Sequence, residues 1–173
     1  MKIMLKQGFT LIELLAVVII LAILATLSIG SYKKSVEQTR FAEGLAAASA
    51  VVEALNRAIF DEKIEGRYNG DILHKYATLD VNLPEECTGD SGNCRATKYF
   101  HVFIEKVGAD EVVRAYRNKK AGNAYPYYIE MYTNYATSKD KLACVGNSSN
   151  EEKGKVFCQS MGYTTCTGHS CTK

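Results

Sequence analysis

The longest apolar stretch of the chain covers residues 9–29 and contains one ionisable side chain, that of Glu13. As an α-helix these 21 residues would span roughly 31 Å, at about 1.5 Å per residue, which matches the hydrocarbon core of a bilayer. The pattern therefore predicts a membrane-spanning helix. A carboxylate inside such a segment is costly and indicates a functional residue by default.

Beyond this run the apolar positions continue at helical spacing. Steps of four and three residues alternate along a single stripe formed by Phe41, Leu45, Ala48, Val52, Leu55 and Ile59. Such a stripe is typical of a helix with one face packed on a core, and charged residues lie off it. We expect one continuous helix from about residue 10 to residue 60, roughly 75 Å long, whose second half packs on a sheet.

Glycine and proline interrupt the pattern in residues 61–98, where a short helical turn is expected at residues 72–76. Three runs rich in β-branched and aromatic residues follow, at residues 99–105, 111–117 and 125–133. Short turns separate them, at residues 107–110 and 119–123. They predict an antiparallel β-meander, so the expected fold class is α+β, with the long helix packed on a small sheet.

All six cysteines lie beyond the apolar run: Cys87, Cys94, Cys144, Cys158, Cys166 and Cys171. An even number confined to the part that would be translocated favours disulfides formed outside the cytoplasm. His169, between two of the cysteines, suggests zinc as a competing interpretation, but the spacings do not form the paired C-x₂₋₄-C pattern of structural zinc sites. We therefore expect no metal and no cofactor.

Four of the six cysteines fall in the last 35 residues. A capping-box pattern at residues 149–152, and Gly162 where a helix would end, predict a short helix at residues 150–161 that carries Cys158. Six cysteines allow fifteen connectivities. Among these we favour Cys144–Cys158, Cys166–Cys171 and Cys87–Cys94.

The chain has 21 Lys and Arg against 19 Asp and Glu, and Lys2 and Lys6 account for the difference. A chain that began at Phe9 would be neutral, which gives no general electrostatic argument for nucleic acid. One local cluster combines basic residues with tyrosines, a combination that could bind single-stranded nucleic acid. Its members are Arg114, Arg117, Lys119, Lys120, Tyr116, Tyr125, Tyr127 and Tyr128. Because alternate strand residues face opposite ways, we favour a solvated hairpin end.

The sequence offers little evidence for a catalytic site. The sequence has three histidines, His74, His101 and His169, and it lacks a G-x-S-x-G elbow, a phosphate-binding glycine loop and an H-E-x-x-H motif. His101 lies in a strand-like alternation and is expected to be a face residue. With 173 residues the chain has room for one membrane helix and one small domain. We expect that the protein is not an enzyme.

The N-terminal segment MKIMLKQG is short, basic and ends in glycine. One interpretation is a secretory signal peptide cut after its apolar region, and the alternative is a cut after Gly8 that keeps the apolar helix. The stretch GFTLIELLAVVIILAILA, which opens on Gly8, favours the second. It resembles the N-terminus of the type IV pilin superfamily, which includes the pseudopilins of type II secretion.

This resemblance covers about the first 45 residues and implies how the chain is processed. A membrane peptidase would cut between Gly8 and Phe9 and would methylate the new N-terminal amine of Phe9. The chain would then consist of a leader, a membrane and assembly half-helix, and a periplasmic or extracellular globular domain, at residues 1–8, 9–30 and 31–173. The implied fold is pilin-like, with a disulfide-rich C-terminal region.

The resemblance also implies location and partners. The protein would cross the inner membrane once, with a cytoplasmic N-terminus and a periplasmic C-terminus, before assembly into a pilus or pseudopilus. Partners would be other pilin subunits, the prepilin peptidase and methyltransferase, and the inner-membrane assembly platform; nucleic acid would become one only if the fibre served DNA uptake. Glu13 would pair with the Phe9 amine of a neighbouring subunit, or alternatively reach the headgroups.

The favoured function is a type IV pilus subunit, and a type II secretion pseudopilin is the alternative. Many major pseudopilins carry an acidic calcium-binding loop near the C-terminus, whereas residues 164–173 contain no acid. An alternative of a different class is a membrane-anchored binding module or adhesin that uses the cysteine-rich region. Ala22 and Gly30 replace a glycine and a proline of many relatives, which leaves open how far the helix melts in a fibre.

Overall fold

The computed structural model describes residues 10–65, 74–87, 92–117, 127–137, 141–146 and 151–173. The chain divides into two compact units, residues 1–39 and residues 40–173. A single helix, α1 (Leu11–Ile64), begins in the first unit and ends in the second. The expected helix is confirmed, and it ends four residues later than the pattern predicted.

Helix α1 has 54 residues without an interruption in its helical backbone. Good helix formers such as alanine and leucine are frequent in it, and it contains no proline. Gly30 lies inside the continuous helix, and a Cβ added there would meet nothing within 4 Å. The two residues that depart from the pilin pattern, Ala22 and Gly30, therefore both adopt helical structure in the isolated chain.

The second unit contains one antiparallel sheet, and its described strands follow the order β1-β2-β3-β4-β5-β6-β8-β7. The strands are β1 (Glu85–Glu86), β2 (Cys94–Ala96), β3 (Phe100–Val107), β4 (Asp110–Arg117), β5 (Tyr127–Tyr132), β6 (Leu142–Gly146), β7 (Thr165–Thr167) and β8 (Ser170–Thr172). Six strands follow chain order as a meander. The chain then forms helix α2 (Glu151–Ser160) before β7 and β8 return as a hairpin, with β8 beside β6.

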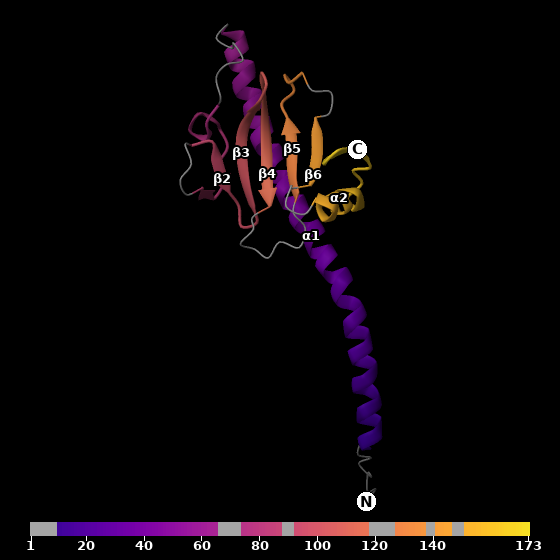
Figure 1. Ribbon diagram of the computed structural model, residues 1–173. Coiled ribbons are helices and arrows are strands. Elements are labelled where there is room, and N and C mark those ends of the chain that lie inside the picture. Colours follow the sequence, from indigo (N-terminus) through magenta and orange to yellow (C-terminus); the bar gives the residue numbers. More distant parts are fainter. Residues whose placement is uncertain (1–9, 66–73, 88–91, 118–126, 138–140, 147–150) are drawn as a thin grey trace, which may run out of the picture. The chain divides into compact units, whose positions relative to one another are not determined.

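The core of the second unit lies between this sheet and the helices, and Figure 1 shows α1 passing behind the central strands. Alternate residues of β3 are fully buried because one face of the strand packs on the helix layer. Phe41 of α1 contacts the rings of Tyr127, Phe157 and Tyr163, with centroid distances of 5.7, 6.0 and 5.9 Å. One aromatic cluster thus joins α1, β5, α2 and the segment after α2.

The predicted apolar stripe is confirmed as the core face of α1. Five of its six members are buried and Leu45 is partly buried against the same core. The three predicted strands and the C-terminal helix are also present, as β3, β4, β5 and α2. The expected turn at residues 119–123 lies outside the described residues, as does the start of the capping box. Of the turn expected at residues 72–76, residues 72 and 73 lie outside them, and the described part has a 3₁₀ turn later in the chain, at Tyr76–Thr78.

Gly44 has a packing role that the stripe did not reveal. It is buried in α1, and a Cβ added there would lie 2.6, 2.7 and 2.8 Å from three ring carbons of Phe100. Such distances are shorter than real contacts, and the Phe100 side chain is fully buried. The absence of a side chain at Gly44 therefore lets the phenyl ring of β3 lie directly on the helix backbone.

We expect Gly44→Ala to lower the free energy of unfolding by about 2 kcal/mol. Three ring carbons under 3 Å from the added Cβ place the overpacking cost near the upper end of its usual range, about 3 kcal/mol, and alanine returns about 1 kcal/mol of helix propensity. Chemical unfolding of the full chain in detergent micelles, followed by tyrosine near-ultraviolet circular dichroism, measures this change. Gly30→Ala is the matched control and should not destabilise the chain. Adding Phe100→Leu should restore part of the loss; equal stability of Gly44→Ala and the parent chain would contradict the packing argument.

Candidate functional site at the start of the long helix

The first turn of α1 is closed by a reciprocal pair of side-chain hydrogen bonds. The backbone N–H of Thr10 donates to Glu13 Oε2 at 2.8 Å, and the Thr10 hydroxyl donates to the same oxygen at 2.7 Å. In return the backbone N–H of Glu13 donates to Thr10 Oγ1 at 3.4 Å. This is a capping box, in which Thr10 is the N-cap and Glu13 satisfies a backbone donor at the helix start.

The sequence contains the signal for this cap, T-x-x-E directly before an apolar run, whereas the roles expected for Glu13 were only charge pairing and headgroup contact. A carboxylate at the N-terminus of a helix is also favoured by the helix dipole. Glu13 therefore has a local structural role as well as any assembly role. Gly8 and Phe9, the residues of the expected cleavage site, lie outside the described residues.

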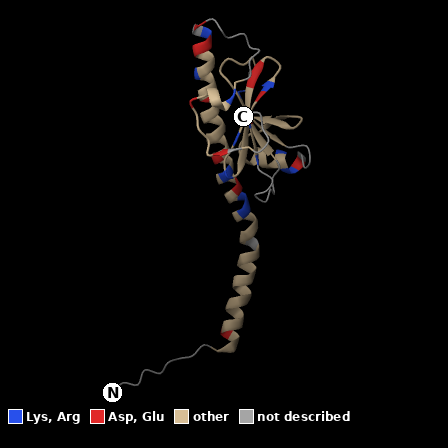
Figure 2. Ribbon diagram, turned by 90° about the vertical axis from the view of Figure 1, so that its left-hand side faces the viewer, with Lys and Arg blue, Asp and Glu red and all other residues tan. Residues whose placement is uncertain are grey.

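The apolar part of α1 exposes its side chains on every side. Between residues 11 and 29 the exposed large aliphatic side chains are 51% to 83% accessible. An 18-residue window of α1 has a mean hydropathy of 2.8, and this is the one helix in the described part that is long and apolar enough to cross a membrane. Figure 2 shows this part of α1 almost free of charged residues.

Hydroxyl groups within this segment are satisfied inside the helix itself. Thr26 donates to the carbonyl of Ile23 at 2.7 Å, and Ser28 donates to the carbonyl of Leu24 at 2.8 Å. Such bonds let serine and threonine lie in an apolar environment. The apolar surface is too large and continuous to remain in water, so it requires lipid or other protein against it.

Comparison with protein families matches residues 3–29 to the prokaryotic N-terminal methylation motif. The chain carries the prepilin-type signal of type IV pilins and pseudopilins. Its matched residues include Gly8 and the whole apolar run of residues 9–29, with Phe9 and Glu13. No curated protein and no solved structure matched the chain in the same comparisons.

This motif is characteristic of structural subunits of the pilin type, which a prepilin peptidase processes. Together with the apolar half of α1 it indicates a membrane-anchored protein. The fold agrees, because a long N-terminal helix followed by an antiparallel sheet is a pilin-like α+β arrangement. The expected prepilin-type motif and the expected α+β fold class are thus confirmed.

The pilin-type domain contains three disulfides, Cys87–Cys94, Cys144–Cys158 and Cys166–Cys171. These are the pairs that the sequence favoured. Cys144–Cys158 joins β6 to α2, with Cα atoms 5.6 Å apart. Cys166 and Cys171 are directly opposite each other in the β7–β8 hairpin, with a Cα separation of 4.0 Å.

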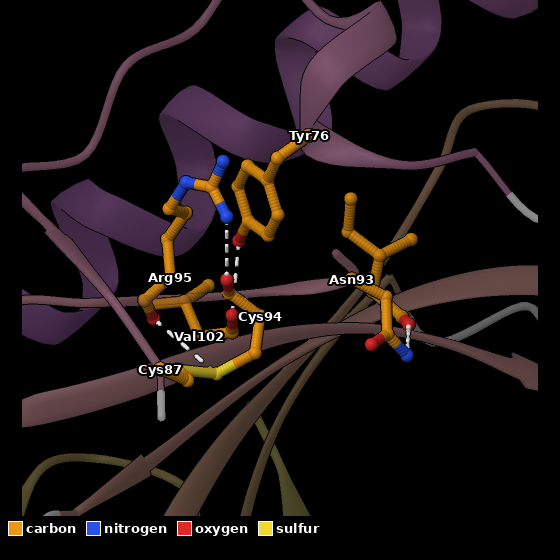
Figure 3. The surroundings of a disulfide bond; sticks show 7 residues. Tyr76, Cys87, Asn93, Cys94, Arg95 and Val102 are labelled. Carbon is orange, nitrogen blue, oxygen red and sulfur yellow. Dashed lines mark hydrogen bonds between the residues drawn. A yellow bond between two sulfur atoms is a disulfide. The ribbon is translucent and has the colours of Figure 1, made fainter. Parts of the chain in front are cut away.

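The Cys87–Cys94 bridge connects β2 to the residue that follows β1 (Figure 3). Beside it the hydroxyl of Tyr76 donates to the carbonyl of Val102 at 3.0 Å, and Arg95 Nη1 donates to the carbonyl of Cys94 at 3.0 Å. Burial raises the pKa of Tyr76 above its usual range, so this hydroxyl remains a hydrogen-bond donor. These contacts anchor the segment before β2 to β3.

The basic and aromatic residues singled out in the sequence divide between the two faces of the sheet. Arg114 lies on the face opposite the helices, where it donates to Glu130 and Glu105 at 2.6 Å each. Arg117 is buried on the other face and donates to the carbonyl of Tyr99 at 3.0 Å. Lys119, Lys120 and Tyr125 lie outside the described residues. The described part of the cluster is therefore a set of structural contacts within the sheet. The two faces separate its side chains as expected, but Arg117 is buried rather than part of a solvated hairpin end.

The histidines occupy three different environments. His101 lies on β3 opposite Tyr116, on the face away from the core, and the His169 carbonyl accepts the N–H of Gly146 at 2.9 Å in the β7–β8 turn. His74 is buried and contacts Glu111 and Glu62. The described ranges contain no group of three or more His, Cys, Asp or Glu side chains that could hold a metal ion.

Proposed function

We propose that the protein is a membrane-anchored prepilin that is cut between Gly8 and Phe9, methylated on the Phe9 amine and polymerised through α1. It spans the inner membrane once, with its N-terminus in the cytoplasm and the domain of residues 31–173 on the periplasmic side. The protein is a structural subunit and has no catalytic role. The observation that carries this proposal is the methylation motif at residues 3–29, in register with an exposed apolar helix.

The chemistry of the leader supports a cut before the helix. Removal of residues 1–8 eliminates the ammonium groups of Lys2 and Lys6 and creates one α-amine at Phe9. Extraction of the apolar helix from the membrane into a fibre then needs no transfer of lysine side chains through lipid. The apolar surface of residues 11–29 would exchange lipid contacts for contacts with the same segment of other subunits.

Within this class we propose a pilus subunit rather than a type II secretion pseudopilin. The support is the composition of residues 164–173, which contain no carboxylate side chain for a calcium loop. This segment instead forms the β7–β8 hairpin, closed by Cys166–Cys171 and paired with β6. Its partners would be other pilin subunits, the peptidase and the assembly platform.

We expect Gly8→Ala to block processing, so that the chain keeps residues 1–8 and an unmethylated N-terminus. The reason is that the peptidase must bring the backbone at residue 8 close to its catalytic carboxylates, and an added Cβ obstructs this approach. Intact-mass spectrometry and N-terminal peptide mapping of protein extracted from a host with a prepilin peptidase measure the outcome. The parent chain should begin at N-methylated Phe9.

Gly30→Ala is the matched control, since residue 30 lies just beyond the matched motif, and it should be processed like the parent. Two results for the parent chain would contradict the proposal. A cut anywhere beyond residue 20 would indicate a secretory signal peptide, and no cut at all would indicate a simple membrane anchor.

A further inference from the structure

A buried ionic cluster joins the end of α1, the segment before the first strands, and β4. His74 Nδ1 lies 2.8 Å from Glu111 Oε2, and the backbone N–H of His74 donates to Glu111 Oε1 at 2.7 Å. On the other side of the ring, His74 Nε2 lies 3.3 Å from Glu62 Oε1. The side chains of His74 and Glu111 are only 4% and 2% exposed, and that of Glu62 is 25% exposed.

The two ring nitrogens are not equivalent in this cluster. Glu111 accepts hydrogen bonds from both the backbone N–H and Nδ1 of His74. This keeps a proton on Nδ1 both in the neutral imidazole and in the imidazolium. Nε2 is fully buried and has no hydrogen-bond partner of good geometry among the described residues, although it faces the Glu62 carboxylate. The proton that leaves when the ring titrates is therefore the one between Nε2 and Glu62.

Four other charged residues are neighbours of the cluster, either in the chain or across the sheet. Lys106 of β3 is the cross-strand partner of Glu111, and Lys75, next to His74, is exposed. Lys63 of α1 lies over the ring of Tyr135, 4.1 Å from its centroid, and Asp110 of β4 accepts hydrogen bonds from Thr137. The groups in contact with the imidazole are thus the two carboxylates, Glu62 and Glu111.

We propose that Glu62, His74 and Glu111 form a pH-sensitive latch that fastens the segment beginning at His74 to the end of α1. With the ring protonated, one imidazolium links α1 through Glu62 and β4 through Glu111. With the ring neutral, the Nδ1 contact to Glu111 persists, but the Nε2 lone pair faces the Glu62 carboxylate and the link to α1 is lost. This device is independent of how the chain is processed or assembled.

The direction of the pH effect follows from the partners. Hydrogen bonding to Glu111, and the charges of both carboxylates, raise the pKa of His74 above 6.5 despite its burial. The latch is therefore fully formed below pH 6.5 and opens as pH rises through the folded-state pKa. The free energy of unfolding that the latch contributes decreases between the pKa of His74 in the unfolded chain and its pKa in the folded chain. Across this range the unfolding equilibrium constant rises about tenfold for each pH unit that separates the two pKa values.

The test is an NMR titration of the full chain, with labelled histidine, in detergent micelles. We expect the Cε1–H resonance of His74 to titrate above pH 6.5, and Glu62→Gln to lower this pKa, because a neutral amide no longer favours the imidazolium. Hydrogen exchange of the Tyr76 amide, which donates to the Gly92 carbonyl, should lose protection through the same pH range after correction for the intrinsic rate. Glu62→Gln should remove that dependence.

His101→Gln is the control variant and should leave both the His74 titration and Tyr76 exchange unchanged. A His74 pKa at or below 6.5, or one that Glu62→Gln does not lower, would overturn the proposal. Titration of His74 without any change in Tyr76 protection would also overturn it, since the ring would then have no latch function. Glu62 is at the partly exposed end of the cluster, so its conservative variant tests the latch without removing the buried imidazole.

Discussion

Glu13→Gln is expected to give a chain that is cleaved and methylated normally but forms no fibres. Glutamine at the third helical position can still accept the hydrogen bond from the Thr10 backbone, so the helix start is kept. Its neutral amide cannot compensate the α-ammonium group of Phe9 on a neighbouring subunit. An unpaired charge in a dry helix bundle costs about 3–5 kcal/mol, repeated at every subunit contact.

The matched variant Thr10→Val separates the two roles of Glu13. Valine has nearly the shape of threonine but removes the Oγ1 that caps the Glu13 amide, a loss of about 0.5–2 kcal/mol, while the carboxylate keeps its charge. We expect Thr10→Val to retain fibres, in reduced amount. Electron microscopy of sheared fibres, with mass spectrometry of the cell-bound subunit, distinguishes failed assembly from failed processing.

Two outcomes would contradict this view. Normal fibres from Glu13→Gln would mean that the carboxylate serves only as a helix cap. Loss of fibres from Thr10→Val at normal processing would mean that the capping box, rather than the charge, is needed for assembly. The first outcome would rule out the pairing between Glu13 and the Phe9 amine, whereas after the second the pairing would rest on the result for Glu13→Gln alone. Cleavage after Gly8 would stand in both cases.

The parts of the fold that the sequence predicted are those with a strong period. The stripe that includes Phe41 and Ile59 repeats over five helical turns, and five of its six members are buried, so the pattern is unambiguous. Strands β3 and β4 were equally clear, because each has eight residues and a tight turn at Gly108, whose φ of 65° suits glycine, joins them.

Strands that are short, or that depend on distant partners, were missed. β1, β2, β7 and β8 have two or three residues each and β6 has five, too few for alternation to be visible. Their pairing is fixed by neighbouring strands and by disulfides, which local propensity does not describe. The placement of β8 beside β6 after an intervening helix is a tertiary property of this kind.

The same reasoning explains what was missed at individual sites. The contact between His74 and Glu111 joins residues 37 apart in the chain, and no local motif announces it. The role of Gly44 likewise comes from a distant residue, because the ring of Phe100 on β3 lies against it. Thr10 is the exception, since the pattern T-x-x-E is a local signal from which its hydrogen bonds to Glu13 could have been predicted.

Removal of the Cys144–Cys158 bridge, by Cys144→Ala with Cys158→Ala, is expected to destabilise the domain by about 3 kcal/mol in the chain-entropy model for a loop of this size. The bridge closes a loop with a sequence separation of 14. Both cysteines are fully buried, so their sulfurs also contribute packing. The bridge fastens α2, and with it Phe157 of the aromatic cluster, to β6. Chemical unfolding of the oxidised chain in detergent micelles measures the loss.

The matched control is Cys166→Ala with Cys171→Ala, which opens a loop with a sequence separation of only 5. The same model gives about 2 kcal/mol for so short a loop, and Cys166 is partly exposed, so less packing is lost. The backbone pairing of β7 with β8, and of β8 with β6, can persist without this bridge. An equal or larger loss in the control would show that the hairpin, rather than α2, is the element whose attachment limits the stability of the C-terminal region.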